Sequence, residues 1–285
     1  MIPAAFDYVA PKSLDEAIAF LREHGDDAKI LAGGHSLLPL MKLRLATPAL
    51  LVDIGRIDGL SYIHDQGNSI AVGAMTTYAT LVESDLVRRR LPLLAQAASM
   101  VGDTQVRNRG TLGGALAHAD PAGDMPAIVS ALGGSVVARG TGGERTIDIA
   151  DLFEDIFTSA LQPDEILTEV RLSVPENAAQ DYQKFRRRAI DWAIVGAAVS
   201  VHRSNGSIAQ ASVVLTNVGP VPTRASATEE ALRNQPVTAE TVAQAAELAA
   251  QDLDPTAELY ASADYKKHLA RVLTRRALTT ALSLE

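Results

Sequence analysis

The sequence contains no cysteine in 285 residues. This absence excludes disulfide bonds, a cysteine nucleophile, thiolate-held zinc and an iron–sulfur cluster from this chain, since each needs cysteine sulfur. A lack of disulfides suits the cytoplasm, so we expect a cytoplasmic location. The sequence also lacks any run of roughly 18 apolar residues and any basic segment followed by an apolar one at its N-terminus. We therefore expect neither a membrane span nor a signal peptide.

Positive charge is in deficit, with 26 Lys and Arg against 34 Asp and Glu and a net charge of −8. This balance argues against nucleic acid or an anionic membrane surface as the main partner. Hydrophobic residues make up 47% and charged residues 21%, which are ordinary values for a globular protein with a sizeable core. The length allows two domains or one large one.

The common catalytic and nucleotide-binding motifs are missing as well. No Gly-x-Gly-x-x-Gly follows an expected strand, and there is no P-loop, no Gly-x-Ser-x-Gly elbow and no His-Glu-x-x-His. The six histidines are scattered and form no close pair. Because the chain has no evident catalytic machinery of its own, we expect a bound cofactor to supply the chemistry.

The most informative stretch that is present runs from Lys29 to Leu38. A short apolar run, expected to be a buried strand, ends at Gly33 and Gly34, and His35 and Ser36 follow. Glycines permit positive φ and close approach of a ligand, and consecutive N–H groups in such a turn form an anion-binding concavity. The stretch indicates a phosphate site, although a tight turn that binds nothing has the same composition.

A second glycine pair, Gly113 and Gly114, follows Thr111 and is expected to form a second turn of this kind. Two phosphate-type turns in one domain suit a dinucleotide whose pyrophosphate is held from two sides. Asp124 could then accept hydrogen bonds from a ribose or an adenine amino group. The alternative is that Asp120-Pro and Gly123-Asp are ordinary turn dipeptides.

Two further features have competing interpretations. The basic run from Lys184 to Arg188 is expected to be a solvated strand end, but it could form a docking patch or place Lys184 against an anionic cofactor. Trp192, the only tryptophan, could belong to the core or cover a planar ring system. The basic residues of the last helix are expected to form a solvated face; they are Lys266, Lys267, Arg271, Arg275 and Arg276.

The pattern of expected elements is α+β. The first fifty-odd residues are expected to form a β-α-β-turn-β unit, whose helix begins with a capping box at Ser13–Glu16 and ends at Gly25. Hairpins and helices follow up to about residue 176, with the helices expected at Thr77–Ser84, Leu91–Met100 and Met125–Leu132. A short linker then leads to three strands and three helices, which are expected at Tyr182–Arg186, Ile194–Arg203, Ser207–Thr216, Ala225–Asn234, Thr238–Ala250 and Ser262–Leu282. Within this part, Ser204-Asn-Gly206 is expected to be a hairpin turn.

These motifs resemble one family over nearly the whole chain. They are Ala32-Gly-Gly-His-Ser36 with the apolar segment after it, Leu51-Val-Asp-Ile54, Thr111-Leu-Gly-Gly114 and Ala119-Asp-Pro-Ala-Gly-Asp124. Together they are similar to the FAD-binding medium subunits of molybdenum hydroxylases, the xanthine dehydrogenase family. Within it, the carbon monoxide dehydrogenase medium subunit group is the most similar.

The resemblance implies a PCMH-type FAD-binding domain at residues 1–176, with subdomains of about 1–57 and 58–176. A C-terminal domain at 177–285 would hold a three-stranded antiparallel sheet and a helical bundle. Both glycine pairs would hold the FAD pyrophosphate, Asp124 would lie on the adenosine side, and Ile166 and Leu167 would lie against the flavin. The implied cofactor-binding residues are Ala32, Gly33, Gly34, His35, Ser36, Leu37, Val101, Thr111, Gly113, Gly114, Ala115, His118, Asp124, Ile166, Leu167, Lys184 and Trp192.

The resemblance also implies electron relay in a heterotrimer, as a dimer of heterotrimers. A large subunit with a molybdenum–pterin cofactor would oxidise carbon monoxide, an N-heterocycle such as nicotine or a purine, or an aldehyde. A small subunit with two [2Fe–2S] clusters would pass the electrons to FAD in this chain, and then to a quinone, NAD or another acceptor. No residue here need be catalytic, and no metal is expected here. Two alternatives are a stand-alone FAD oxidoreductase of the same fold and a structural subunit without cofactor.

Overall fold

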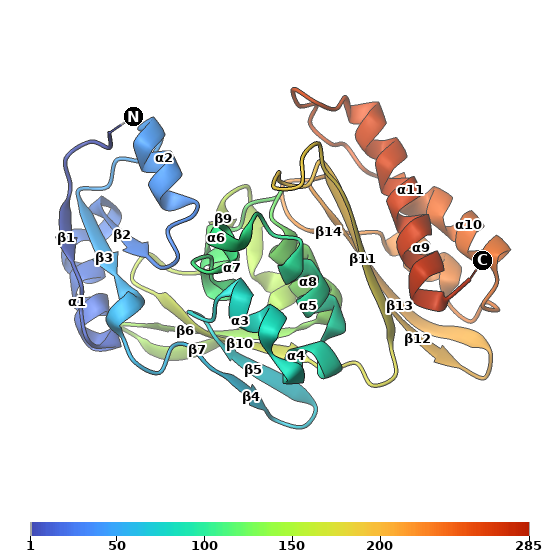
Figure 1. The fold of residues 1–285 in the computed structure, drawn as a ribbon, viewed down its shortest axis with the longest axis horizontal. Coiled ribbons are helices and arrows are strands. Elements are labelled where there is room, and N and C mark those ends of the chain that lie inside the picture. Colours follow the sequence, from blue (N-terminus) through green and yellow to red (C-terminus); the bar gives the residue numbers. More distant parts are fainter. Residues whose placement is uncertain (1, 285) are drawn as a thin grey trace.

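A computed structural model describes residues 2–284, which form three bodies side by side (Figure 1). The N-terminal body contains a small parallel sheet in the order β1-β3-β2. It supplies the turn between β2 and α2, which faces the middle body. Its elements are β1 (Asp7–Val9), α1 (Leu14–His24), β2 (Ala28–Leu31), α2 (Leu37–Leu43) and β3 (Leu50–Asp53).

Helix α1 forms where the sequence provides both end signals. The Ser13 hydroxyl accepts a hydrogen bond from the Glu16 N–H, and Gly25 ends the helix with φ of +51°. The Glu16 carboxylate accepts from the Lys12 N–H, one residue earlier than in a standard capping box. The helix buries Ala17, Ile18 and Leu21 in the core of this body.

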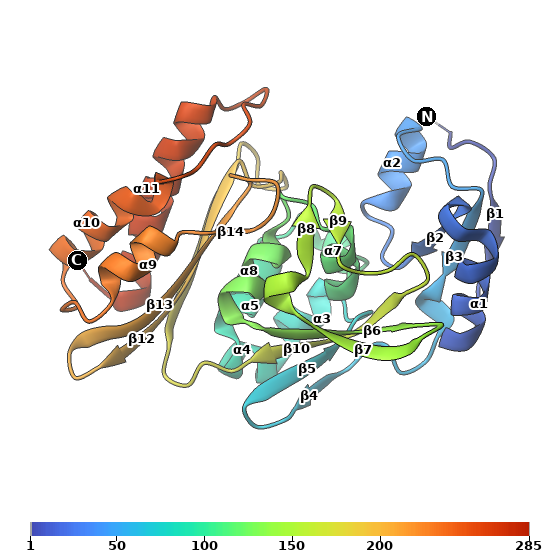
Figure 2. The ribbon, with the colours of Figure 1, turned by 180° about the vertical axis from the view of Figure 1, so that it is seen from behind.

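The middle body is a five-stranded antiparallel sheet in the order β4-β5-β10-β6-β7. Helices lie on one side of it (Figures 1 and 2), and their apolar residues share one core with β5, β6 and β10. The strands are β4 (Ile63–Asp65), β5 (Ser69–Gly73), β6 (Gly134–Gly140), β7 (Gly143–Asp148) and β10 (Ile166–Ser173). The helices are α3 (Tyr78–Glu83), α4 (Asp85–Arg90), α5 (Pro92–Ser99), α6 (Thr104–Arg107), α7 (Leu112–His118) and α8 (Asp124–Leu132).

The structure differs from the sequence-based expectation in this body. Helices α4 and α6 were not expected; the side chains of Ser84 and Asp103 accept hydrogen bonds from their first turns. A small hairpin of β8 (Phe153–Asp155) and β9 (Thr158–Ser159) was also not expected. The prediction of a second glycine turn is wrong in form, because Gly113 and Gly114 lie in the first turn of α7, capped by Thr111.

The C-terminal body has an antiparallel sheet in the order β11-β12-β13-β14. The three expected strands are present, and β14 adds a two-residue edge. Its helices contribute to a second core with the sheet. The elements are β11 (Ala179–Phe185), β12 (Val195–Ser204), β13 (Ser207–Thr216), β14 (Thr223–Arg224), α9 (Ser226–Leu232), α10 (Ala239–Glu247) and α11 (Ala263–Leu282).

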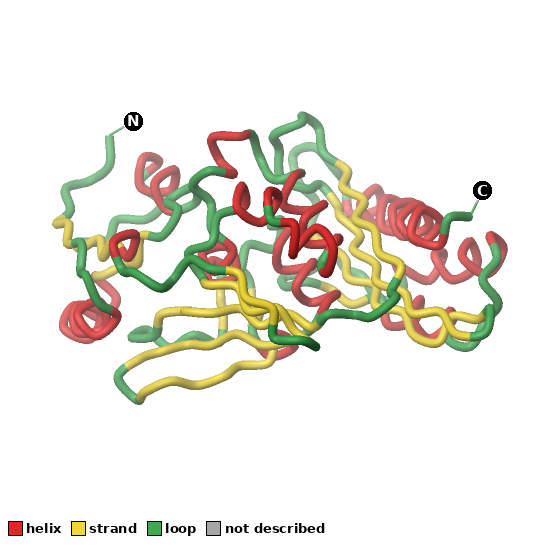
Figure 3. Tube along the Cα trace, turned by 60° about the horizontal axis from the view of Figure 1, so that its bottom comes forward, coloured by secondary structure: helices red, strands yellow, loops and turns green. Residues whose placement is uncertain are grey.

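Helices lie on both sides of this C-terminal sheet (Figure 3). On β12, Val195, Val199 and Val201 pack with the C-terminal helices, whereas Ala198 belongs to the core of the middle body. The alternation follows from the two-residue period of a strand. A strand covered on both faces needs an almost continuous apolar sequence, which explains the apolar run in β12.

One expectation about the C-terminal helix is wrong. Lys266 is not solvated, because its side chain is 2% exposed and donates to Glu258 Oε1 and to the Asn217 carbonyl oxygen at 3.1 Å. Its position in α11 faces the sheet, where the sequence alone gave no sign of a polar partner. Among residues 2–284 no helix has both the length and the apolar character that crossing a bilayer requires.

We predict that Gly113→Ala destabilises the fold. A Cβ at this position would lie 2.5 Å from the Ala74 Cβ and 2.8 Å from the Ala74 carbonyl oxygen. Alanine is usually the better helix former, but this overlap should lower the free energy of unfolding by about 1–3 kcal/mol. The measurement is urea denaturation followed by circular dichroism. Gly142→Ala, where nothing lies within 4 Å, is the matched control. Equal stability of the two variants would contradict the predicted overlap.

Candidate functional site

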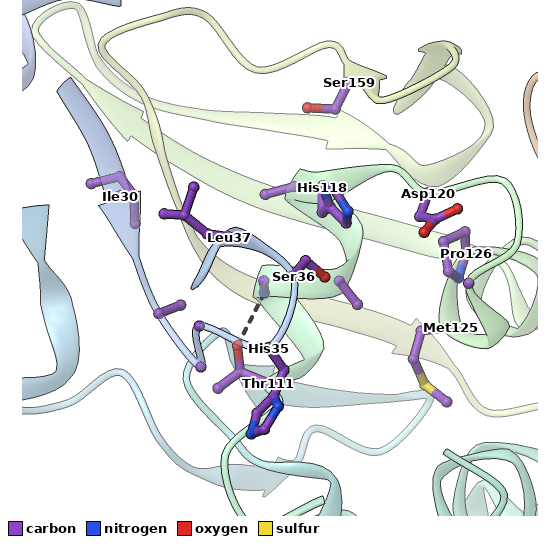
Figure 4. A pocket seen from close by; sticks show the side chains of 18 of the residues that line it. Ile30, His35, Ser36, Leu37, Thr111, His118, Asp120, Met125, Pro126 and Ser159 are labelled. Carbon is purple, nitrogen blue, oxygen red and sulfur yellow. Dashed lines mark hydrogen bonds between the residues drawn. The ribbon is translucent and has the colours of Figure 1, made fainter. Parts of the chain in front are cut away.

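A cavity of about 530 Å³ lies where the three bodies meet. The β2–α2 turn forms one wall, α7 and the start of α8 form another, and residues 190–192 of the C-terminal body reach its rim. Figure 4 shows His35, Ser36 and Leu37 facing Thr111 and His118. A cavity of this size, lined by segments from all three bodies, is typical of a site for an organic cofactor.

The first glycine pair forms a left-handed turn after β2. Gly34 has φ of +78°, and a Cβ on Gly33 would lie 2.2 Å from the Arg109 carbonyl oxygen. Gly33 therefore lets the β2–α2 turn pack closely against the main chain at Arg109, and it can also let a ligand approach. Within residues 2–284, the N–H groups of Gly34, His35 and Ser36 donate no hydrogen bond. Three consecutive unused donors beside a cavity match the expected anion-binding turn.

The second glycine pair is satisfied internally. The N–H of Gly114 donates to Thr111 Oγ1 at 3.2 Å, and the N–H of Gly113 donates to the Ala74 carbonyl oxygen at 2.9 Å. A Cβ on Gly114 would lie 3.6 Å from the Ala32 Cβ, so the two glycine motifs pack against each other. The two motifs are adjacent, as expected if a pyrophosphate is held from two sides. Within the described residues, however, of the two only the turn at residues 34–36 has main-chain N–H groups without acceptors.

A buried charged group closes the cavity near α8. The Lys184 ammonium lies 2.8 Å from Asp124 Oδ2, and the Tyr182 hydroxyl donates to Asp124 Oδ1 at 2.6 Å. The side chains of Lys184 and Asp124 are 1% and 3% exposed, so Lys184 is not part of a solvated strand end. Burial raises the pKa of the Asp124 carboxyl, and the Lys184 ammonium opposes that shift. Each carboxylate oxygen retains acceptor capacity for a ligand.

The rim of the cavity carries exposed apolar side chains. Trp192 is 57% exposed, so the interpretation of this residue as core is wrong, and Ile190 beside it is 58% exposed. Both line the cavity. His118 stacks on Phe157 with ring centroids 5.1 Å apart, and burial lowers the pKa of His118. Aromatic rings at a cavity of this kind can stack on a planar ligand.

Most expected site residues line the cavity, and three do not. The lining includes Ala32, Gly33, Gly34, His35, Ser36, Leu37, Val101, Thr111, Gly114, Ala115, His118, Asp124, Lys184 and Trp192. Gly113 packs against Ala74 instead. The side chains of Ile166 and Leu167 are 2% and 5% exposed and belong to the apolar cores, because β10 turns them into the protein.

Several lining residues were not expected from the sequence. Leu161 and Glu165 reach the cavity from the segment before β10, where Ile166 and Leu167 were expected to do so. Gly102 and Val106 come from the polar stretch around α6, and Ile190 precedes the tryptophan. Of these residues, only Ile190 could have been expected from the sequence, because it lies two positions before Trp192. The other residues reach the cavity through tertiary contacts that the sequence does not indicate.

Comparison with known proteins gives the family. Residues 4–175 match the FAD binding domain in molybdopterin dehydrogenase, and residues 180–281 match the CO dehydrogenase flavoprotein C-terminal domain. The carbon monoxide dehydrogenase medium chain of Hydrogenophaga pseudoflava is 41% identical over 99% of this chain and 98% of its own. The 6-hydroxypseudooxynicotine dehydrogenase complex subunit alpha of Paenarthrobacter nicotinovorans is 38% identical, covering 99% and 96%.

A solved structure of similar shape is the carbon monoxide dehydrogenase from Hydrogenophaga pseudoflava that lacks the Mo-pyranopterin moiety of its cofactor. It matches with a TM-score of 0.97 and 43% identity over 99% of both chains. The α+β fold and the family expected from the glycine motifs are thereby confirmed. The chain belongs to the family of FAD-binding medium subunits of molybdenum-containing dehydrogenases.

Proposed function

We propose that this chain is the FAD-carrying electron-transfer subunit of a heterotrimeric molybdenum hydroxylase. It would accept electrons from the [2Fe–2S] clusters of a small subunit and pass them to an external acceptor, while a large molybdopterin subunit oxidises the substrate. The observation that carries the proposal is that the N–H groups of Gly34, His35 and Ser36 find no acceptor among residues 2–284 and lie beside a cavity of about 530 Å³. Such donors suit the oxygens of a pyrophosphate.

The cavity residues fit FAD by size and by charge. Ala32, Gly33, Gly34, Gly114 and Ala115 present little or no side chain, so a ligand can reach the main chain. The Thr111 hydroxyl oxygen accepts from the Gly114 N–H, and no acceptor for the hydroxyl hydrogen occurs within residues 2–284. When bound, FAD supplies the redox chemistry that no side chain provides.

We assign the ends of the cavity by their chemistry. Asp124 offers acceptors for the adenosine part, and Lys184 holds that carboxylate in place at 2.8 Å. The rings of Trp192 and His118 line the cavity, and His118 is backed by the stacked ring of Phe157. Their task is to orient the cofactor and limit water, and no residue is assigned a proton transfer on the substrate.

The proposed partners follow from the family and from the composition. The chain has no cysteine, so its electron donor's clusters must be held by another chain. We propose a dimer of heterotrimers in the cytoplasm, with a quinone, NAD or another acceptor. Substrate choice would lie with the large subunit. In support, two relatives of similar identity bear the names of different substrates, carbon monoxide and 6-hydroxypseudooxynicotine.

We predict that the purified complex carries one FAD per copy of this chain, with an absorption band at about 450 nm from oxidised flavin. Flavin released by denaturation is quantified against protein, and iron and molybdenum are measured in the same sample. Flavin with both metals and two partner chains supports the proposal. Flavin in an isolated, active chain would favour a stand-alone oxidoreductase, and a colourless complex that takes up no FAD would favour a structural subunit.

We predict a separable role for Asp124 in stability and in FAD binding. Asp124→Asn leaves Lys184 buried without its counter-ion, which should cost about 3–5 kcal/mol of unfolding free energy. The double variant with Lys184→Met removes both charges and should regain most of that loss. Unfolding is measured with urea, and FAD affinity by titration of the apo chain.

The two measurements distinguish structural from ligand-binding roles. If Asp124 also contacts the adenosine, the double variant regains stability but binds FAD more weakly than the wild type. Recovery of both properties in the double variant would show that Asp124 acts only through its ion pair.

A further inference from the structure

Asn217, at the end of β13, connects two walls of the cavity. It has a left-handed main chain, with φ of +62°. Its N–H donates to the Pro121 carbonyl oxygen at 2.9 Å, and its Nδ2 donates to the carbonyl oxygens of Ala193 at 2.9 Å and Ile194 at 3.3 Å. Asn217 of the C-terminal body thus contacts two segments that are distant in sequence, one through its main-chain N–H and the other through its side chain.

Both segments carry cavity residues. Pro121 lies between Asp120 and Asp124, which line the cavity on the side of α8. Ala193 directly follows Trp192 at the rim. A change in the position of Asn217 would therefore move either wall relative to the other.

Asn217 is itself held by a buried lysine. Lys266 Nζ donates to the Asn217 carbonyl oxygen at 3.1 Å and to Glu258 Oε1, and Asn217 Nδ2 donates to the same Glu258 oxygen at 2.9 Å. Burying an ammonium group costs several kcal/mol of free energy, and its pairing with a carboxylate returns about the same amount. The arrangement therefore adds little to the free energy of unfolding. What it does supply is a fixed direction for each hydrogen bond.

The segment that contains Glu258 also contacts the loop that carries Trp192. The guanidinium of Arg187 lies 4.1 Å from the centroid of the Tyr260 ring. Between Arg187 and Ala193, the described bonds of the loop are internal, such as the Arg188 N–H to Asp191 Oδ2 at 3.2 Å. The exposed Trp192 is thus held at the two ends of its loop, by Tyr260 and by Asn217.

We propose that Asn217, Glu258 and Lys266 are positioning residues that set the place of the Trp192 segment against the cavity and so strengthen retention of the cofactor. The inference rests on the proposed function, since it assigns the three residues a role toward FAD. It gives the C-terminal domain a part in the cofactor site beyond Lys184 and Trp192, through residues that do not line the cavity.

The test uses Trp192 as an intrinsic probe, because it is the only tryptophan of the chain. Asn217→Gly keeps the left-handed main chain and removes only the side-chain bonds. Lys266→Met removes the ammonium and keeps an apolar stem of similar length. Arg275→Met, at an exposed position of the same helix, is the control. Fluorescence quenching by acrylamide is measured on the apo full-length chain, with thermal melting on the same samples.

We expect both variants to make Trp192 more accessible to acrylamide when measured well below their melting temperatures. The gain should be less than about twofold, because Trp192 is already 57% exposed. We expect FAD to bind about five- to tenfold more weakly, the size of one or two lost hydrogen bonds. The control should match the wild type in both. Unchanged quenching and unchanged affinity in Asn217→Gly would overturn the proposal.

Failure of this inference is distinguishable from failure of the proposed function. If the wild-type chain takes up no FAD, the proposed function fails, while the quenching comparison still reports on the segment. If FAD binds to the wild type and to Asn217→Gly equally, only the positioning role fails. A variant that melts much earlier yet quenches like the wild type when folded would also count against that role.

Discussion

The close approach of main chain to main chain between the first two bodies is the constraint on which the site depends. Gly33 lies against the Arg109 carbonyl oxygen, and Gly114 lies close to Ala32. Any side chain at Gly33 would separate the β2–α2 turn from the segment before α7. Both segments also line the cavity. The glycines thus act first on the protein's own packing, and their exposure of main chain to a ligand follows from that packing.

The two glycine motifs look alike in the sequence but differ in what they leave available. The N–H groups of α7's first turn are used by Thr111, Thr76 and Ala74, whereas those of residues 34–36 are unused within the described chain. A phosphate-binding role therefore falls mainly on the first motif. The second supplies a hydroxyl and a smooth surface. The difference depends on which main-chain N–H groups already have acceptors in the fold, and the sequence does not show this.

Local signals predicted much of the fold. Ser13 and Gly25 delimit α1, and the Ser204-Asn-Gly206 turn joins β12 and β13, as their residue types indicate. What local signals missed depends on tertiary contact. Lys266 has the helical spacing of a solvated residue, yet a carboxylate and a carbonyl distant in sequence make its burial possible. The resemblance implied that Ile166 lies against the flavin, and in the fold its side chain packs in an apolar core. The family motifs located the cavity, and only the fold identified which neighbours complete it.

The position of Ala198, Tyr182 and Val214 in the core of the middle body has a consequence for how the chain can be divided. The family comparison separates two regions near residue 176, but the C-terminal sheet is the outer cover of α5 and α8 as well as the base of its own helices. A chain cut there would leave an apolar layer uncovered on each piece. The two regions match separate family models, but residues of both form one apolar core. They are therefore expected to fold together and not one by one.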